Sequence, residues 1–156
     1  GLSRPELSSR LIVTLGTADL ARARKFYEEC LGWRPFMTEG MTAYDMGGIA
    51  FGLFAHDALA DDADLPHSPV TEGSYHGFAI AYNARSEQEV DEILAHIADK
   101  GTTYGAKVLK EAHKAFWGGY SAYFADPDGH AWEVAYNPYW PVSDDGKLGL
   151  PEPEAG

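Results

Sequence analysis

His76 and Glu133 are the two side chains of this sequence whose types and positions could do chemistry together. His76 begins an alternating segment in which Phe78 shares its face, so its side chain is predicted to point inward among apolar residues. Glu133 lies between Trp132 and Val134, and its side chain points the opposite way from both. If Trp132 packs under a helix, Glu133 faces away from that helix, toward a ligand-binding surface.

An imidazole and a carboxylate of this kind support three interpretations. Both are ligands for zinc, iron, manganese or nickel, although a catalytic site normally has three protein ligands. Glu133 could instead be a general base or an anchor for a polar ligand group, oriented by His76. The third interpretation is a hydrogen-bonded pair with a structural role, because a buried carboxylate must find partners. The sequence leaves all three open.

The elements that must position these residues can be predicted from local signals. Ser86, with Glu89 three residues later, forms a capping box and predicts a helix that ends near Gly101. The sequence DPDG at residues 126–129 predicts a type I turn before the strand that carries Glu133. We predict strands at residues 76–82, 106–111, 117–124 and 131–136.

The first half of the sequence has the same order of elements. A strand at residues 11–15 leads to a helix that Asp19 caps and Gly32 ends. We take Asn83 as the residue equivalent to Asp19 in the second half. Three more strands are predicted at residues 33–38, 42–46 and 49–55.

An overlay of the halves shows which positions keep polar side chains. The overlay on the helix starts places Ile12 on His76. Matching the last strands through their leading glycines places Gly52 on Glu133. At these two positions the second half therefore has polar side chains, whereas the first half has an apolar side chain or none.

Packing of the two halves predicts the fold class. A lone half would leave one face of a four-stranded sheet bare, so two such sheets are expected to cover each other or to enclose a cleft. We predict one α+β domain of paired mixed β-sheets flanked by helices at residues 1–138. Its modules are at about 9–55 and 74–138, with a linker at 56–73 and an acidic tail containing Pro and Gly at 139–156.

Composition excludes several classes of partner. The chain has 156 residues and a formal net charge of −12, which argues against a nucleic-acid partner. It contains no run of about twenty apolar residues that could span a membrane. Cys30 is its one cysteine, which rules out an intrachain disulfide and fits a reducing compartment. We therefore expect a cytoplasmic protein.

Two segments carry a resemblance to a known family. The sequence TADLARARKFYEECLGW at residues 17–33 and the sequence YFADPDGHAWEVAYNP at residues 123–138 resemble the vicinal oxygen chelate superfamily. This superfamily includes glyoxalase I, bleomycin-resistance proteins, fosfomycin-resistance enzymes and extradiol dioxygenases. The resemblance implies two βαβββ modules around a cleft. It assigns the four metal-ligand positions to Ile12, Gly52, His76 and Glu133, of which only the last two can bind a metal.

The resemblance also implies a function. We expect a protein that binds a small organic molecule in the cleft, without a complete metal site or another cofactor, and that forms a homodimer. One alternative is a lyase, isomerase or dioxygenase that uses a divalent metal, Zn, Fe, Mn or Ni. A third metal ligand would then come from His113, His130, Asp45 or Glu39. The other alternative is a protein that sequesters a drug of the bleomycin type.

Aromatic residues are the candidates for lining such a cleft. A flat organic ligand would suit an aromatic surface, although the same residues could form the hydrophobic core. The candidates are Tyr44, Phe51, Phe78, Phe116, Trp117, Tyr120 and Tyr123.

Overall fold

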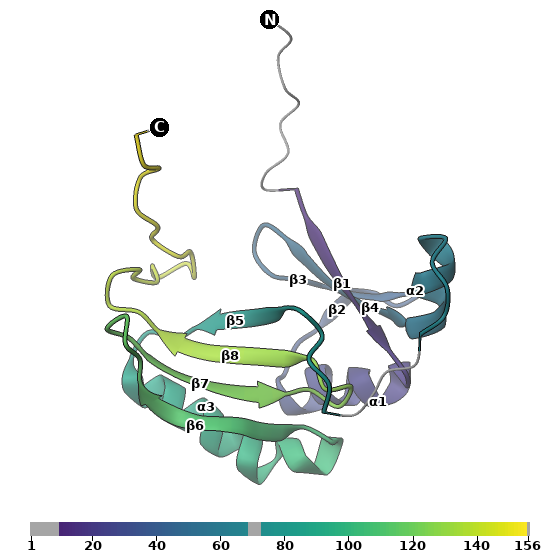
Figure 1. The fold of residues 1–156 in the computed structure, drawn as a ribbon, viewed down its shortest axis with the longest axis horizontal. Coiled ribbons are helices and arrows are strands. Elements are labelled where there is room, and N and C mark those ends of the chain that lie inside the picture. Colours follow the sequence, from purple (N-terminus) through teal and green to yellow (C-terminus); the bar gives the residue numbers. More distant parts are fainter. Residues whose placement is uncertain (1–9, 69–72, 156) are drawn as a thin grey trace, which may run out of the picture. The chain divides into compact units, whose positions relative to one another are not determined.

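The computed structural model describes residues 10–68 and 73–155 of the chain (Figure 1). The chain divides into two compact units, Gly1–Pro69 and Val70–Gly156, and the division falls inside the segment predicted as a linker. Within the described residues, no helix is both long and apolar enough to cross a bilayer.

The first unit is a four-stranded mixed sheet with helices. Its strand order is β1-β4-β3-β2, in which β1 is parallel to β4 and the other neighbours are antiparallel. This order confirms the predicted βαβββ module. The elements are β1 (Ile12–Thr17), α1 (Leu20–Lys25), the π-helical turn η1 (Phe26–Cys30), β2 (Pro35–Met37), β3 (Thr42–Asp45), β4 (Ala50–Ala55) and α2 (His56–Asp62).

The first helix begins at the predicted cap and carries the aromatic core of this unit. The Asp19 side chain accepts a hydrogen bond of 3.0 Å from the backbone N–H of Arg22, which satisfies one of the free donors at the helix start. α1 then continues into η1, where Phe26 and Tyr27 are completely buried. These two rings meet edge to face with centroids 5.0 Å apart, and they fix the helix on the sheet.

Tyr44 and Phe51 belong to the same core, which corrects their prediction as pocket residues. They are register partners on β3 and β4, and both are almost completely buried. The ring centroid of Tyr27 lies 5.1 Å from that of Phe51 and 6.3 Å from that of Tyr44. Alternation along the two strands turns both side chains toward the helix, so they are not available to a ligand on the opposite face.

A polar network holds the phenol of Tyr44 at the border of this core. Tyr44 donates a hydrogen bond of 2.9 Å to Glu28 Oε2, and the Arg24 guanidinium bonds the same carboxylate at 2.7 and 3.2 Å. The hydrogen bond from Arg24 is the largest influence on the pKa of Glu28 and lowers it. Partial burial opposes this shift, and the hydrogen bond from Tyr44 adds to it.

The lowered pKa of Glu28 predicts a pH dependence of stability. The folded-state value lies below the unfolded one of about 4.3, so the carboxylate stabilises the fold above the unfolded pKa. This stabilisation is lost as the pH falls through the folded pKa. We expect Glu28→Gln to weaken the loss of stability between neutral and acidic pH, measured by urea denaturation across that range. Glu29→Gln, at the exposed neighbouring position, should behave as wild type; identical pH profiles for the two variants would contradict the assignment.

Residues 56–62 form α2, although the whole segment 56–73 was predicted as a linker. α2 contacts β1 and β4. Its start packs closely on β1, because a Cβ placed on Gly16 would lie 3.0 Å from Nδ1 of His56. No residue of α2 is buried, so the helix has no apolar stripe that periodicity could detect.

The second unit repeats the architecture of the first. Its sheet has the order β5-β8-β7-β6, with β5 parallel to β8 and the other neighbours antiparallel. The two mixed sheets with flanking helices match the predicted α+β fold. The elements are β5 (Ala79–Asn83), α3 (Glu87–Asp99), the 3-10 turn η2 (Gly101–Tyr104), β6 (Lys107–Lys114), β7 (Tyr120–Ala125) and β8 (Ala131–Tyr136).

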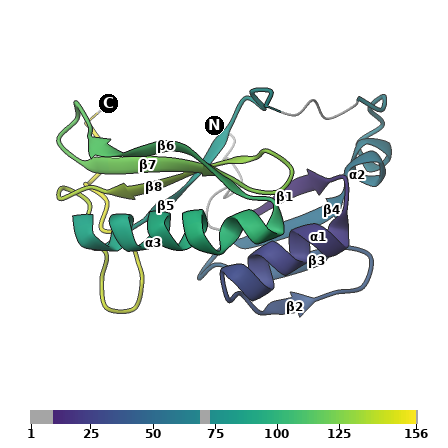
Figure 2. The ribbon, with the colours of Figure 1, turned by 90° about the horizontal axis from the view of Figure 1, so that it is seen from below.

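α3 lies along one face of this sheet (Figure 2). Ser86 caps the helix as predicted, since its side-chain oxygen accepts a hydrogen bond of 3.0 Å from the backbone N–H of Glu89. The predicted apolar stripe is buried through Val90, Leu94 and Ile97, and the helix contacts β6, β7 and β8. The helix of this unit therefore covers one face of the sheet. The opposite face is the one that a lone module is expected to leave bare.

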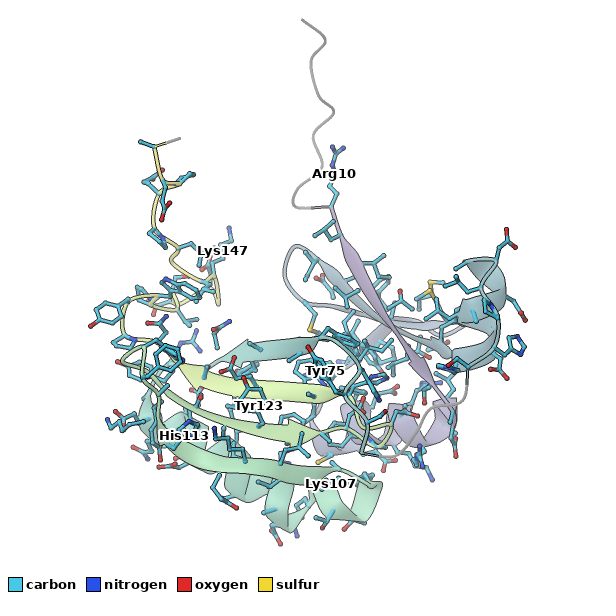
Figure 3. All side chains as sticks on the ribbon, viewed as in Figure 1. Arg10, Tyr75, Lys107, His113, Tyr123 and Lys147 are labelled. Carbon is cyan, nitrogen blue, oxygen red and sulfur yellow. The ribbon has the colours of Figure 1, made fainter. Side chains whose placement is uncertain are left out.

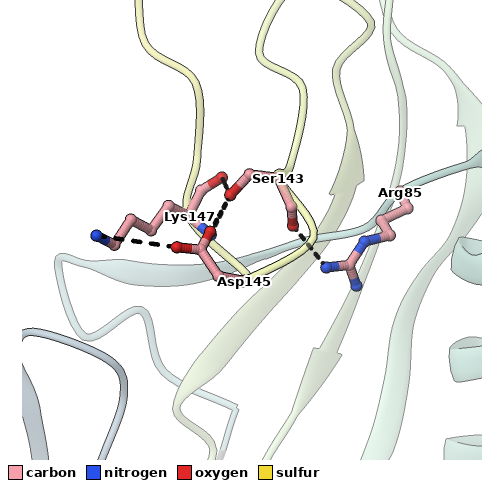
Figure 4. A network of polar contacts seen from close by, with 4 residues as sticks. All are labelled: Arg85, Ser143, Asp145 and Lys147. Atoms are coloured by element: carbon pink, nitrogen blue, oxygen red, sulfur yellow. Dashed lines mark hydrogen bonds and ion pairs between the residues drawn. The ribbon is translucent and has the colours of Figure 1, made fainter.

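The segment after β8 is held against the second unit (Figure 4). Arg85, in the loop before α3, donates a hydrogen bond of 2.8 Å to the backbone carbonyl of Ser143. The backbone N–H of Ser143 bonds the carbonyl of Lys147 at 2.8 Å, and Val142 pairs with Leu148. The tail predicted at residues 139–156 thus contains a hairpin-like turn that a specific arginine contacts.

Candidate functional site

The face of the second sheet that turns away from α3 carries the candidate site (Figure 3). Trp132 and Val134 are buried on the side of α3. The intervening Glu133 therefore points to the other side, which is the orientation that alternation predicts. The register places Tyr123 of β7 and Ala81 of β5 on either side of Glu133.

Tyr123 and Glu133 interact directly on this face. The pKa of Tyr123 is raised, first by burial and then by the negative charge of Glu133 and a hydrogen bond to its carboxylate. The phenol therefore stays protonated at neutral pH and lies beside the carboxylate of its register partner. Such a pair can offer both a donor and an acceptor to a polar ligand, and its carboxylate can take up a proton.

His76 has different neighbours from Glu133. It lies in the segment before β5, and its Nδ1 is 2.8 Å from Nδ1 of His130, which precedes β8. The two ring centroids are 4.8 Å apart. The His130 ring also lies against Phe78, at 5.8 Å between centroids. The position directly beside Glu133 on β5 is Ala81. The structure thus brings Glu133 together with Tyr123, and His76 together with His130.

The overlay that set His76 on Ile12 is wrong by three residues. In the first sheet Ile12 pairs with Ala50, and in the second sheet Ala79 pairs with Ala131. Matching the last strands through their leading glycines makes Ala50 equivalent to Ala131. The equivalent of Ile12 is therefore Ala79, a residue without a metal-binding side chain.

The physical cause of this error is the choice of helix start. The residue that caps the second helix is Ser86, as Asp19 caps the first. The overlay instead used Asn83, which ends strand β5. The strand of the second module consequently begins at Ala79, and the predicted strand start at His76 is wrong.

The corresponding place in the first unit has no carboxylate or imidazole. Gly52 pairs with Thr14 of β1 and with Ala43 of β3. A Cβ placed on Gly52 would collide with the terminal methyl of Met41 and would lie 3.4 Å from Ile12. The methionine methyl thus fills the space in which a liganding side chain at position 52 would begin.

The donor set can be tested against the divalent metal that the family implies. Within residues 10–68 and 73–155, no group of three or more His, Cys, Asp and Glu side chains is arranged to hold a metal ion. Of the predicted third ligands, Asp45 accepts a hydrogen bond of 2.8 Å from Gly47 in a turn, and His130 contacts His76. His113 lies on β6, with Nδ1 3.3 Å from the carbonyl of Glu111. The side chains of the described residues do not fit a three-ligand metal centre.

The remaining aromatic candidates divide among three places. Tyr120 lies on the side of α3, where its hydroxyl donates a hydrogen bond of 2.7 Å to Asp91, and it does not share the face of Glu133. Phe116 and Trp117 lie in the hairpin between β6 and β7, and Phe116 is fully exposed. Tyr123 alone among the predicted aromatic residues of β7 shares the face of Glu133.

One residue on this face was missed by sequence reasoning. Lys110 of β6 is the register partner of Tyr123. The predicted strand at residues 106–111 contains it, but two irregularities in the pairing of β6 with β7 decide which side chains share a face with Tyr123. No sequence signal marks these irregularities.

Comparison with known proteins agrees with this architecture. Residues 11–134 match the model of the glyoxalase/bleomycin resistance protein/dioxygenase superfamily. The structure is similar to that of a glyoxalase-related enzyme from Fulvimarina pelagi, with 33% sequence identity, 92% of this chain and 99% of that chain covered, and a TM-score of 0.78. A lactoylglutathione lyase from Agrobacterium tumefaciens shares the fold at 23% identity, with 86% and 98% covered and a TM-score of 0.64. The chain belongs to the glyoxalase/bleomycin resistance protein/dioxygenase superfamily.

Proposed function

We propose that this protein binds a small organic molecule on the face of the second sheet that carries Tyr123 and Glu133, without a complete metal site. The observation that carries the proposal is the interaction of a protonated phenol with a carboxylate on the sheet face away from α3. A polar pair on a strand is held in place by the sheet and needs no large rearrangement to meet a ligand.

The surroundings of this pair favour a ligand over a structural role. Its neighbours on β5 are the exposed Ala79 and Ala81, whose small side chains leave space beside the carboxylate. Glu133 is itself only half-buried, so burial does not force it to find a partner inside the protein. A ligand hydroxyl or amine can therefore reach the carboxylate.

The chemistry of the pair follows from its protonation. Glu133 accepts a hydrogen bond from a ligand donor, and Tyr123 donates to a ligand oxygen once the ligand competes for the carboxylate. If the ligand is transformed, Glu133 is the residue that would remove a proton from it. The predicted catalytic role of His76 alongside Glu133 stays a prediction; the contact that His76 makes is with His130.

Metal-independent binding is the second part of the proposal. A catalytic metal normally has three protein ligands, and the strand positions equivalent across the two sheets carry Ile12, Gly52, Ala79 and Glu133. A single carboxylate does not hold a divalent metal tightly. The metal-dependent lyase, isomerase or dioxygenase and the drug-sequestering protein remain the alternatives that the experiment below separates.

The experiment measures binding of a fragment set to the full-length protein by ligand-observed NMR. The set contains small hydroxy, carbonyl and amine compounds together with bleomycin. Glu133→Gln and Tyr123→Phe should each weaken the fragments that bind by about tenfold, because each removes one hydrogen bond to a charged or polar group. Glu92→Gln, on the exposed side of α3, is the matched control and should bind as wild type.

Three results would contradict the proposal. Fragment binding that survives both site variants would place the ligand elsewhere. Stoichiometric tight binding of Zn, Fe, Mn or Ni, with fragment binding abolished by EDTA, would favour the metal-dependent enzyme. Binding of bleomycin alone, lost at high salt, would favour sequestration.

A further inference from the structure

Strand β6 gives the proposed site a positive edge in an acidic protein. Its sequence KVLKEAHK contains three of the six lysines of a chain whose formal net charge is −12. Figure 3 labels Lys107 and His113 near its two ends. The placement of these cations relative to Glu133 bears on which ligand the face accepts.

The register brings the basic side chains of Lys110 and His113, with Lys107 farther along the strand, onto the face of Tyr123 and Glu133. Lys110 pairs with Tyr123, and Tyr123 pairs in turn with Glu133, so the three residues form one row across β6, β7 and β8. His113 pairs with Ser121, which is two residues from Tyr123 on the same face. The irregularities in β6 are what keep both Lys110 and His113 on this side.

Two of the lysines of β6, Lys114 and Lys110, have different surroundings. Lys114 forms an ion pair of 2.5 Å with Glu87 at the start of α3 and lies 5.7 Å from the Tyr120 ring, so it belongs to the side of the helix. The Lys110 side chain is exposed and forms no hydrogen bond or ion pair with any residue that the structure describes. Lysines on an edge strand discourage pairing with another sheet. Protection of an edge strand explains why β6 contains lysines. It does not explain why a lysine lies opposite Tyr123.

We propose that the ligand is a small organic acid whose anionic group is held by Lys110 and His113 and whose opposite end donates a hydrogen bond to Glu133. The inference rests on the proposed function and names the ligand class for the same face. Neighbouring strands are about 4.8 Å apart, so β6 and β8 are separated by about 10 Å. A single aromatic ring or a short branched chain with polar groups at both ends spans this distance once the lysine side chain reaches inward.

The charges of the row explain why both ends of the ligand matter. A carboxylate placed at Glu133 would be repelled by it, whereas the same group at Lys110 is attracted. A hydroxyl at the far end meets a carboxylate that accepts its hydrogen bond, beside a phenol that stays protonated. The face therefore selects one orientation of such a molecule.

Three compounds of one shape test this inference on the full-length protein. The probes are 4-hydroxybenzoate, the neutral 4-hydroxybenzamide and the cationic 4-hydroxybenzamidine, measured by titration calorimetry at low salt. We expect 4-hydroxybenzoate to bind about tenfold more tightly than the amide, and the amidine to bind weakest. Lys110→Met should abolish the preference and Lys110→Arg should retain it. Lys100→Met, at the exposed end of α3, is the control and should leave it unchanged.

The outcomes separate this inference from the proposed function. If all three probes bind equally and Glu133→Gln weakens each of them, the binding face is correct and the assignment of an acid is overturned. Tightest binding of the amidine, binding of none of the probes, or a preference that survives Lys110→Met also overturns it. Thermal unfolding of Lys110→Met should match wild type because the residue is exposed, so a lost preference reports on binding.

Discussion

Replacing Phe26 by alanine should lower the free energy of unfolding by about 3–5 kcal/mol. Phe26 is completely buried where α1 passes into η1, and its ring meets Tyr27 edge to face. Removing the ring loses the transfer of a large apolar group from water and leaves a cavity that a packed core only partly refills. Urea denaturation followed by tryptophan fluorescence measures the change.

Phe36→Ala is the matched control for this prediction. Phe36 lies on β2 of the same unit but is mostly exposed, so its loss should change stability by no more than about 0.5 kcal/mol. Equal effects of the two substitutions would show that the helix does not cover the sheet through Phe26. Because the chain divides into two units, Phe26→Ala should shift the transition of the first unit if two transitions are seen, and Phe36→Ala should leave both transitions nearly unchanged.

Asp126→Ala should destabilise the second unit by on the order of 1–3 kcal/mol. Asp126 is almost completely buried in the turn between β7 and β8. One of its carboxylate oxygens accepts hydrogen bonds of 2.9 Å from the backbone N–H groups of both Asp128 and His130. Alanine leaves these two donors without that acceptor, which is costly where water cannot replace it. Thermal and urea unfolding measure the effect.

Asp126→Asn separates the hydrogen bonds from the general effect of substitution. Its amide oxygen can still accept from both backbone donors, so this variant should retain most of the stability that alanine loses. Asp144→Ala removes an exposed carboxylate from the same unit and should be nearly neutral. A loss for Asn as large as that for alanine would show that the charge, and not the turn hydrogen bonds, stabilises this hairpin.

The fold could be predicted from the sequence wherever a local chemical signal marks an element. Asp19 and Ser86 cap their helices as predicted, because their side chains have a free backbone donor to satisfy. The strand Ala131–Tyr136 begins and ends as predicted, since the preceding DPDG sequence leaves little choice of turn. Helix α2 was missed because it buries no apolar residue.

The site was only partly predictable, and the reason is register. Strand alternation is sufficient to orient Glu133, because its two neighbours are large and apolar. Alternation does not identify the partner of Glu133. A shift of three residues in the overlay places His76 where the structure has Ala79. Lys110 could not be predicted either, because irregular pairing of β6 with β7 changes which side chains share a face.

The contact of Met41 with Gly52 makes these two positions of the first unit epistatic. Any side chain introduced at position 52 must first displace the methionine methyl from the space beside Thr14. The effect of a carboxylate there therefore depends on which residue stands at position 41, and the two substitutions should not be additive. Because this methyl is the far end of a flexible side chain, Met41 can turn away from Gly52, and a shorter residue at position 41 would leave the space beside Thr14 open to an acidic group at position 52.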